Sequence, residues 1–121
     1  MDIEAFRQYC LSKKGTTEEF PFGPSTLVFK VMGKMFAAVD VDAFESVNLK
    51  CDPETAVELR ERYEQVTPGY HMNKKHWNTV LLRAGLDDRL VLQWVDESYA
   101  LVVQSLSRAQ KAALQDDITA N

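Results

Sequence analysis

The stretch TLVFKVMGKMFAAVD, residues 26–40, decides the fold class of this chain. Apolar side chains alternate with others along residues 26–31, which is typical of a strand with one buried face, and a second apolar run follows at residues 35–41. Met32-Gly33-Lys34 separates the two runs and predicts a hairpin. A third alternating run, residues 45–50, extends the pattern. We therefore expect an antiparallel meander of three strands.

Helices are predicted before and after this meander in the sequence. Asp2 is a suitable cap for a first helix that ends near residue 13, and residues 17–24, with two prolines and a glycine, indicate a loop or a short extended piece. Asp52-Pro53 is a strong start for a second helix, because a capping carboxylate precedes a proline at the first helical position. The apolar stripe of that helix continues to Val66.

The C-terminal half predicts one or two more strands and two helices. Residues 77–82 are strand-like, and Asp87 or Asp88 caps a long helix that runs to about residue 106. Ser107 and Gln110 have the spacing of a capping box for a short last helix. The strands cluster instead of alternating with helices. This order favours an α+β fold, with helices packed on one face of an antiparallel sheet.

Length and composition predict one globular domain over residues 1–121, with residues 115–121 as a frayed tail. The chain is 45% hydrophobic and 26% charged, which is typical of a folded domain. No apolar run reaches the ~18–20 residues of a membrane span. The N-terminus carries acids where a secretory signal carries basic residues, so we expect a cytoplasmic protein with no membrane partner. A net charge of −4 excludes a general nucleic-acid coat.

Sequence patterns for catalysis or cofactor binding are not found. Cys10 and Cys51 form no CxxC motif and are interpreted as structural thiols, with a bridge or a reactive thiol as alternatives. No nucleophile elbow, phosphate-binding glycine loop or spaced set of metal ligands occurs. We therefore predict no catalytic residue, no metal and no cofactor.

The charge is distributed unevenly. Residues 65–86 carry three basic side chains and no acid, so their net charge of +3 leaves −7 for the remainder of the chain. Within this stretch, residues 70–78 combine cations, hydrogen-bond donors and aromatic rings, which suit phosphates and unstacked bases. The alternative is a solvated turn between two strands, with Tyr70 and Trp77 facing the core.

A family resemblance rests on the same segment. The string GYHMNKKHWNTV, residues 69–80, resembles the hallmark of the MmcQ/YjbR family of small bacterial proteins. Supporting strings occur in the same order, and the resemblance covers about residues 3–115. These strings are EFPFG at 19–23, FKV to GKMFA at 29–37, NLK at 48–50 and DESY at 96–99. The resemblance implies a single α+β domain similar to frataxin/CyaY, with a double-wing arrangement, and DNA binding.

Residues for a DNA contact follow from this resemblance by position. They are His71, Asn73, Lys74, Lys75, His76 and Trp77, with Lys30, Lys34 and Lys50 of the meander as neighbours. Similarity to frataxin also suggests iron binding, but that requires an acidic ridge on the first helix, which here has only Asp2 and Glu4.

Two other functions stay open at this point. One is a non-enzymatic module that binds a protein or an anionic ligand, with the His/Trp motif mainly structural. The other is an enzyme that uses His71 or His76 as acid or base. We expect a monomer or a weak dimer.

Overall fold

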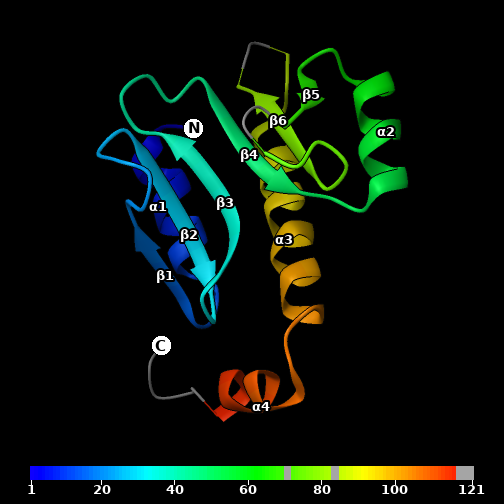
Figure 1. Cartoon of the computed structure of the whole chain (residues 1–121). Helices are drawn as coiled ribbons and strands as arrows, with labels where there is room; N and C mark the ends of the chain where they lie inside the picture. The colour runs from blue at the N-terminus through cyan, green and yellow to red at the C-terminus, as the bar shows by residue number, and fades with distance from the viewer. Residues whose placement is uncertain (70–71, 83–84, 117–121) are drawn as a thin grey trace.

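The computed structural model describes residues 1–69, 72–82 and 85–116, and within them six antiparallel strands form one sheet (Figure 1). The strand order is β1-β2-β3-β4-β6-β5. The strands are β1 (Thr16–Glu19), β2 (Thr26–Val31), β3 (Lys34–Asp40), β4 (Ser46–Lys50), β5 (Val66–Pro68) and β6 (Trp77–Leu81). The helices are α1 (Ile3–Leu11), α2 (Pro53–Arg62), α3 (Asp88–Gln104) and α4 (Arg108–Asp116).

The helices begin where the sequence predicts them. Asp2 accepts a hydrogen bond from the Ala5 amide at 2.8 Å, and Asp87 accepts one from the Arg89 amide at 2.8 Å. Both halves of the predicted capping box form at the start of α4, at 3.0 and 3.1 Å. Helix α4 runs to Asp116, and the remainder of the predicted tail lies outside the described residues.

The α+β fold predicted from the strand pattern is confirmed. Helix α3 packs on β2, β3 and β4, and α1 packs beside β1, so both lie behind the sheet in Figure 1. The hairpin between β2 and β3 is also confirmed: Met32 and Gly33 have φ angles of 51° and 80°. Two consecutive positive φ angles are the geometry of a type I′ turn, whose twist matches that of the flanking strands.

The core lies between the sheet and the helices. Phe6, Phe29 and Phe36 are fully buried, and the ring of Phe36 meets that of Tyr99 edge to face at a centroid distance of 5.3 Å. The hydroxyl of Ser98 on α3 donates to the Phe36 carbonyl at 2.6 Å and accepts from the Lys50 amide at 2.9 Å. This buried serine fixes the position of α3 against β3 and β4.

The predicted number of strands before α2 and the predicted end of α2 are wrong. Of the two structures predicted for residues 17–24, a loop or a short extended piece, the extended one is found at the start, where Thr16–Glu19 form β1 and pair with Val28–Val31 of β2. Four strands, not three, therefore precede α2 in the described chain. Helix α2 ends at Arg62, and Val66 lies in β5, where it pairs with Val80 of β6. Pairing with a neighbouring strand overrides the helical periodicity at this position.

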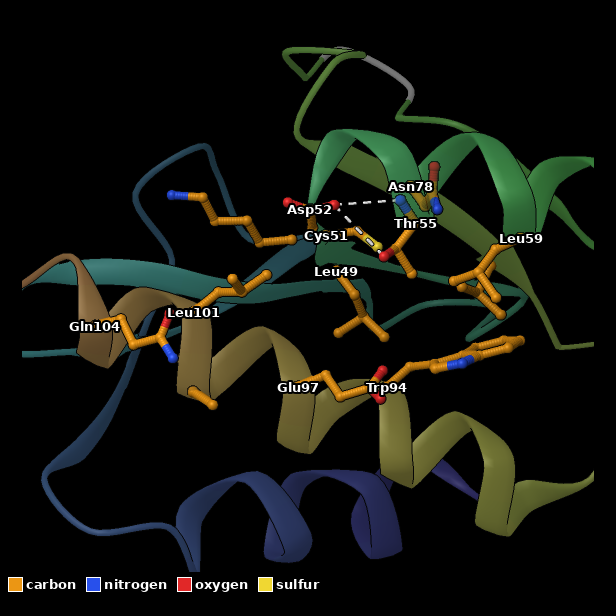
Figure 2. A pocket seen from close by; sticks show the side chains of 13 residues that line it. Leu49, Cys51, Asp52, Thr55, Leu59, Asn78, Trp94, Glu97, Leu101 and Gln104 are labelled. Carbon is orange, nitrogen blue, oxygen red and sulfur yellow. Dashed lines mark hydrogen bonds between the residues drawn. The ribbon is translucent and has the colours of Figure 1, made fainter.

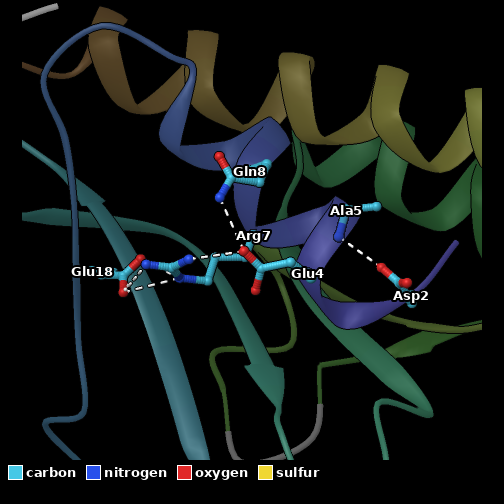
Figure 3. Close-up of polar contacts among 6 residues, drawn as sticks. All are labelled: Asp2, Glu4, Ala5, Arg7, Gln8 and Glu18. Atoms are coloured by element: carbon cyan, nitrogen blue, oxygen red, sulfur yellow. Dashed lines mark hydrogen bonds and ion pairs between the residues drawn. The ribbon is translucent and has the colours of Figure 1, made fainter.

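An ion pair joins α1 to the edge strand β1 (Figure 3). The guanidinium of Arg7 binds both carboxylate oxygens of Glu18, with Nε–Oε2 at 2.8 Å and Nη2–Oε1 at 3.0 Å. Its Nη1 also donates to Glu4 at 3.0 Å. Because the contact with Glu18 is bidentate, it fixes direction as well as distance between the helix and the strand.

Candidate functional site

The hallmark segment lies at the carboxyl end of β4. Trp77, the first residue of β6, pairs with Lys50, and the Cys51 amide donates to the His76 carbonyl at 2.8 Å. Asn73, Lys74 and Lys75 are exposed, and His76 is half-buried. Tyr70 and His71 lie outside the described residues, so the site role predicted for His71 stays a prediction.

Local hydrogen bonds hold the turn before β6 together. Asn73 Oδ1 accepts from the Lys75 amide at 3.0 Å, and its carbonyl accepts from the His76 amide at 3.2 Å. Lys74 Nζ donates to the Gly69 carbonyl at 3.1 Å. A Cβ on Gly69 would lie 2.8 Å from the Cβ of Trp77, so the backbone approaches Trp77 more closely than any larger residue allows.

Arg60 joins this segment to helix α2. Its Nε donates to Asn78 Oδ1 at 2.7 Å, and its Nη2 donates to the Trp77 carbonyl at 3.3 Å and to the Lys74 carbonyl. One guanidinium thus binds three acceptors of the hallmark segment. The planar guanidinium suits this arrangement because it presents several N–H donors in fixed directions.

Two side chains of the segment are buried, one aromatic and one an amide. Trp77 is 9% exposed and Asn78 is 2% exposed. In this conformation the indole presents little surface on which a base could stack. Among the described residues of the predicted site, the accessible groups are therefore its lysines and Asn73, with His76 half-buried.

The sheet register brings the predicted lysines to one end of the sheet. Strands β2 and β4 end there, and β3 and β6 begin there, so Lys30, Lys34 and Lys50 lie at the same end as the turn before β6. Lys30 forms an ion pair with Glu19, and Lys34 Nζ donates to the Ser105 carbonyl at 3.1 Å. Within the described residues, the amines of Lys50 and Lys75 have no such partner.

A pocket of about 280 Å³ lies behind the hallmark segment, between β4, β6, α2 and α3 (Figure 2). Most of its wall is apolar. The apolar side chains are those of Leu49, Leu59, Val80, Trp94, Ala100 and Leu101. Clefts of this kind, apolar with a few polar groups, are typical binding sites for small molecules. The volume is at the lower end of the usual range, so a ligand would be compact.

Asn78 contributes an unsatisfied donor to this wall. Its Oδ1 must face Arg60, because a guanidinium can only donate, and this fixes the orientation of the amide. The amide nitrogen, Nδ2, is buried and has no hydrogen-bond partner within the described residues. A buried donor without an acceptor costs about 1–3 kcal/mol, so Asn78 is held in an arrangement that a ligand acceptor would relieve.

Two carboxylates, the amine of Lys50 and a thiol also line the pocket. Burial, with the charges of Glu97 and Asp52, raises the pKa of the Cys51 thiol to about 11, so it is neutral at physiological pH. Asp52 caps α2 and accepts from the Thr55 amide at 3.3 Å and the Thr55 hydroxyl at 3.5 Å. Glu97 is exposed on α3, and its carboxylate accepts from Gln93 at 3.5 Å.

A family model described as YjbR matches residues 11–101 of the chain. The chain belongs to the YjbR family. The uncharacterised protein YjbR of Escherichia coli (strain K12) is 35% identical over 115 residues, which are 94% of this chain and 98% of that protein. The uncharacterised protein YyaQ of Bacillus subtilis (strain 168) is 29% identical over 75 residues, covering 62% and 63%.

Solved structures resemble this YjbR domain in fold as well. The crystal structure of Deinococcus radiodurans protein DR2400, a DUF419 domain, superimposes with a TM-score of 0.86 at 36% identity, covering 94% of this chain and 88% of that one. A crystal structure of a Pseudomonas syringae protein gives a TM-score of 0.69 at 28% identity, with coverage of 84% and 98%. The family and the α+β architecture are thus established.

Sequence reasoning missed the pocket of this YjbR domain. Arg60 looked like one more charged residue on a helix surface, and Cys51 like a structural thiol. A usable signal was nevertheless present in the short strings that carry the YjbR resemblance. Three of these strings place residues on the pocket wall, namely Leu49 and Lys50, Asn78 and Val80, and Glu97.

The remaining sequence predictions concern thiols, metals and membranes. Cys10 and Cys51 are both free, so the bridge is excluded; Cys10 is fully buried and Cys51 is half-buried. Within the described parts of this YjbR chain, no three His, Cys, Asp or Glu side chains are grouped so as to hold a metal ion. A search of the same residues finds no helix with the length and apolar character needed to cross a bilayer.

Proposed function

We propose that this YjbR domain is a ligand-binding module whose small-molecule ligand occupies the pocket between β4, β6, α2 and α3. The observation that carries the proposal is the side chain of Asn78, which lines a mainly apolar pocket and whose buried Nδ2 has no hydrogen-bond partner in the described structure. Native proteins pair nearly all such groups, with protein, water or ligand. A ligand carbonyl in the pocket would supply the missing acceptor.

The position of the hallmark segment supports this proposal. Arg60 holds Asn78 by its oxygen, and the turn before β6 is closed by its own hydrogen bonds. The amide of Asn78 is therefore fixed before a ligand arrives. A donor that is already oriented binds without the entropic cost of ordering it. In this proposal the His/Trp motif is the support of the site.

Cys51 offers a direct test, because it lines the pocket and Cys10 is fully buried. Iodoacetamide should alkylate Cys51 slowly. A pKa near 11 instead of 9.0 is a gap of two pH units, so the thiolate fraction at pH 8 is about a hundredfold below that of an ordinary thiol. The rate should rise roughly tenfold per pH unit up to pH 10, because only the thiolate reacts. Millimolar benzamide, an aromatic ring with one carbonyl acceptor, should protect Cys51 from alkylation.

The matched control for alkylation is a second thiol outside the pocket. Ala112→Cys in a Cys51→Ser background places a thiol on the exposed surface of α4, where benzamide should not change the rate. In a chain that keeps both native cysteines, the substitution Asn78→Leu should remove the protection of Cys51 by benzamide. Equal alkylation of Cys51 with and without benzamide, and with a series of substituted benzamides, would overturn the proposal.

DNA binding is a second candidate function, favoured by the sheet register that brings several lysines to one end of the sheet. Contact with phosphates by Lys30, Lys34, Lys50, Lys74 and Lys75 needs no exposed indole. Asn73 and His76 lie in the same turn and would add hydrogen-bond donors. The double-wing resemblance adds a fold analogy, which alone does not establish function.

A salt titration of DNA binding tests this second candidate. With three to five phosphate contacts, log K should fall with log salt concentration at a slope of about −3 to −4 between about 50 and about 200 mM salt. Lys50→Glu with Lys75→Glu should abolish the fluorescence anisotropy change of a labelled duplex. Arg108→Glu with Lys111→Glu on α4 makes the same charge change elsewhere and should leave binding intact. If neither duplex nor single-stranded DNA binds the wild type at low salt, this function is excluded.

A further inference from the structure

We infer that the pocket selects a compact ligand with a hydrogen-bond acceptor at one end and a protonated amine at the other, the acceptor bound by Asn78 and the amine by Glu97. The inference rests on the proposed function of the pocket and adds the chemical class of its ligand. It follows from the position of three groups, namely the unpaired amide nitrogen, the apolar wall and the carboxylate of α3.

The acceptor end is determined by Asn78. The amide nitrogen of Asn78 can only donate a hydrogen bond, and Arg60 already donates to its oxygen. A hydrogen-bond donor on the ligand would therefore find no partner on this side chain. A carbonyl or an unprotonated ring nitrogen fits this position. A hydroxyl would also fit, as an acceptor.

The body of the ligand is determined by the walls. Leu59 on α2, Val80 on β6 and Trp94 on α3 face the space between the elements. A pocket of about 280 Å³ accommodates roughly one ring system, not a nucleotide or a peptide. The apolar wall also favours a body without charges of its own.

The amine end is determined by Glu97. Figure 2 shows Glu97 projecting from α3, while Asn78 belongs to the sheet on the other side of the pocket. One oxygen of Asp52, Oδ2, is used in capping α2, whereas the carboxylate of Glu97 has one long contact, with Gln93 at 3.5 Å. Glu97 therefore retains lone pairs for a cation.

The local field has the sign that an amine needs. Glu97 and Asp52 both raise the pKa of the neighbouring Cys51 thiol, and the opposing effect of Arg60 is smaller than either. Lys50 also lines the pocket, so its wall carries two carboxylates and one ammonium, a net charge of −1.

Two ligands of equal shape test the inference. We expect 4-(aminomethyl)benzamide to bind about two- to fivefold more tightly than 4-(hydroxymethyl)benzamide, the gain of a partly exposed ion pair. Affinity is measured by protection of Cys51 from iodoacetamide and by titration calorimetry. Glu97→Gln should abolish the difference and leave the hydroxymethyl affinity unchanged. Glu45→Gln makes the same charge change at the opposite end of β4 and should preserve the difference.

The outcomes distinguish the two proposals. If the hydroxymethyl compound protects Cys51 and the amine adds nothing, the pocket binds ligands but the amine inference is wrong. If the advantage survives Glu97→Gln, the inference is equally wrong. If neither compound protects Cys51, the proposed function fails together with the inference that rests on it.

Discussion

Replacing Trp77 with alanine is expected to lower the free energy of unfolding by roughly 3–5 kcal/mol, the usual cost of deleting a buried aromatic side chain. The indole is 9% exposed and lies against the close backbone approach at Gly69. Alanine would leave a cavity that this fixed turn cannot collapse to fill. Urea denaturation followed by far-UV circular dichroism measures the loss.

The control for Trp77→Ala is Lys75→Ala, two residues earlier in the chain. Lys75 is exposed, and its side chain has no bonding partner in the described structure, so its removal should change stability by less than about 0.5 kcal/mol. A loss for Trp77→Ala as small as that of Lys75→Ala would contradict a structural role for the indole. The motif would then need a functional explanation.

Replacing Arg60 with methionine is the second large change, with an expected loss of roughly 2–4 kcal/mol. Methionine keeps the apolar stem but leaves Asn78 Oδ1 and the Trp77 carbonyl without their donor. Arg62→Met is the matched control, because Arg62 lies on the same helix and, among the residues that the structure describes, its charge contacts only the Tyr63 ring, at 5.5 Å. That variant should remain close to wild type in a thermal melt.

A double variant separates the lost hydrogen bond from lost packing. Replacing both partners of a buried hydrogen bond by apolar groups is nearly neutral, whereas removing one is costly. Arg60→Met with Asn78→Leu should therefore be more stable than Arg60→Met alone. Additive losses in the two single variants would mean that the Arg60–Asn78 bond is not the source of the effect.

Alternation and capping made most of the fold predictable. Residues 26–50 show the pleat of three strands, and Asp52-Pro53 marks a helix start with a specific hydrogen-bonding geometry. The number of strands before α2 and the position of Val66 were predicted wrongly for the same reason. Each depends on a partner strand, β2 or β6, and a local pattern contains no information about a distant partner.

The site was less predictable than the fold. The segment 70–78 stands out by charge, yet the burial of Trp77 and the bond from Arg60 to Asn78 appear only once α2 is packed beside β6. The pocket likewise requires four elements to meet. Charge and spacing along a chain identify exposed groups well. They do not reveal which amide nitrogen will be left without an acceptor.

The two outer strands of the sheet bear on how these molecules behave when concentrated. Strand β1 has four residues and ends in Glu18-Glu19, while β5 has three and ends in Pro68. Short edges that carry carboxylates or a proline are poor templates for a strand from a neighbouring molecule. Arg7 also holds β1 against α1. Both edges of the sheet are therefore poor sites for edge-to-edge pairing between molecules. Solutions concentrated enough for ligand titrations should stay free of fibrils.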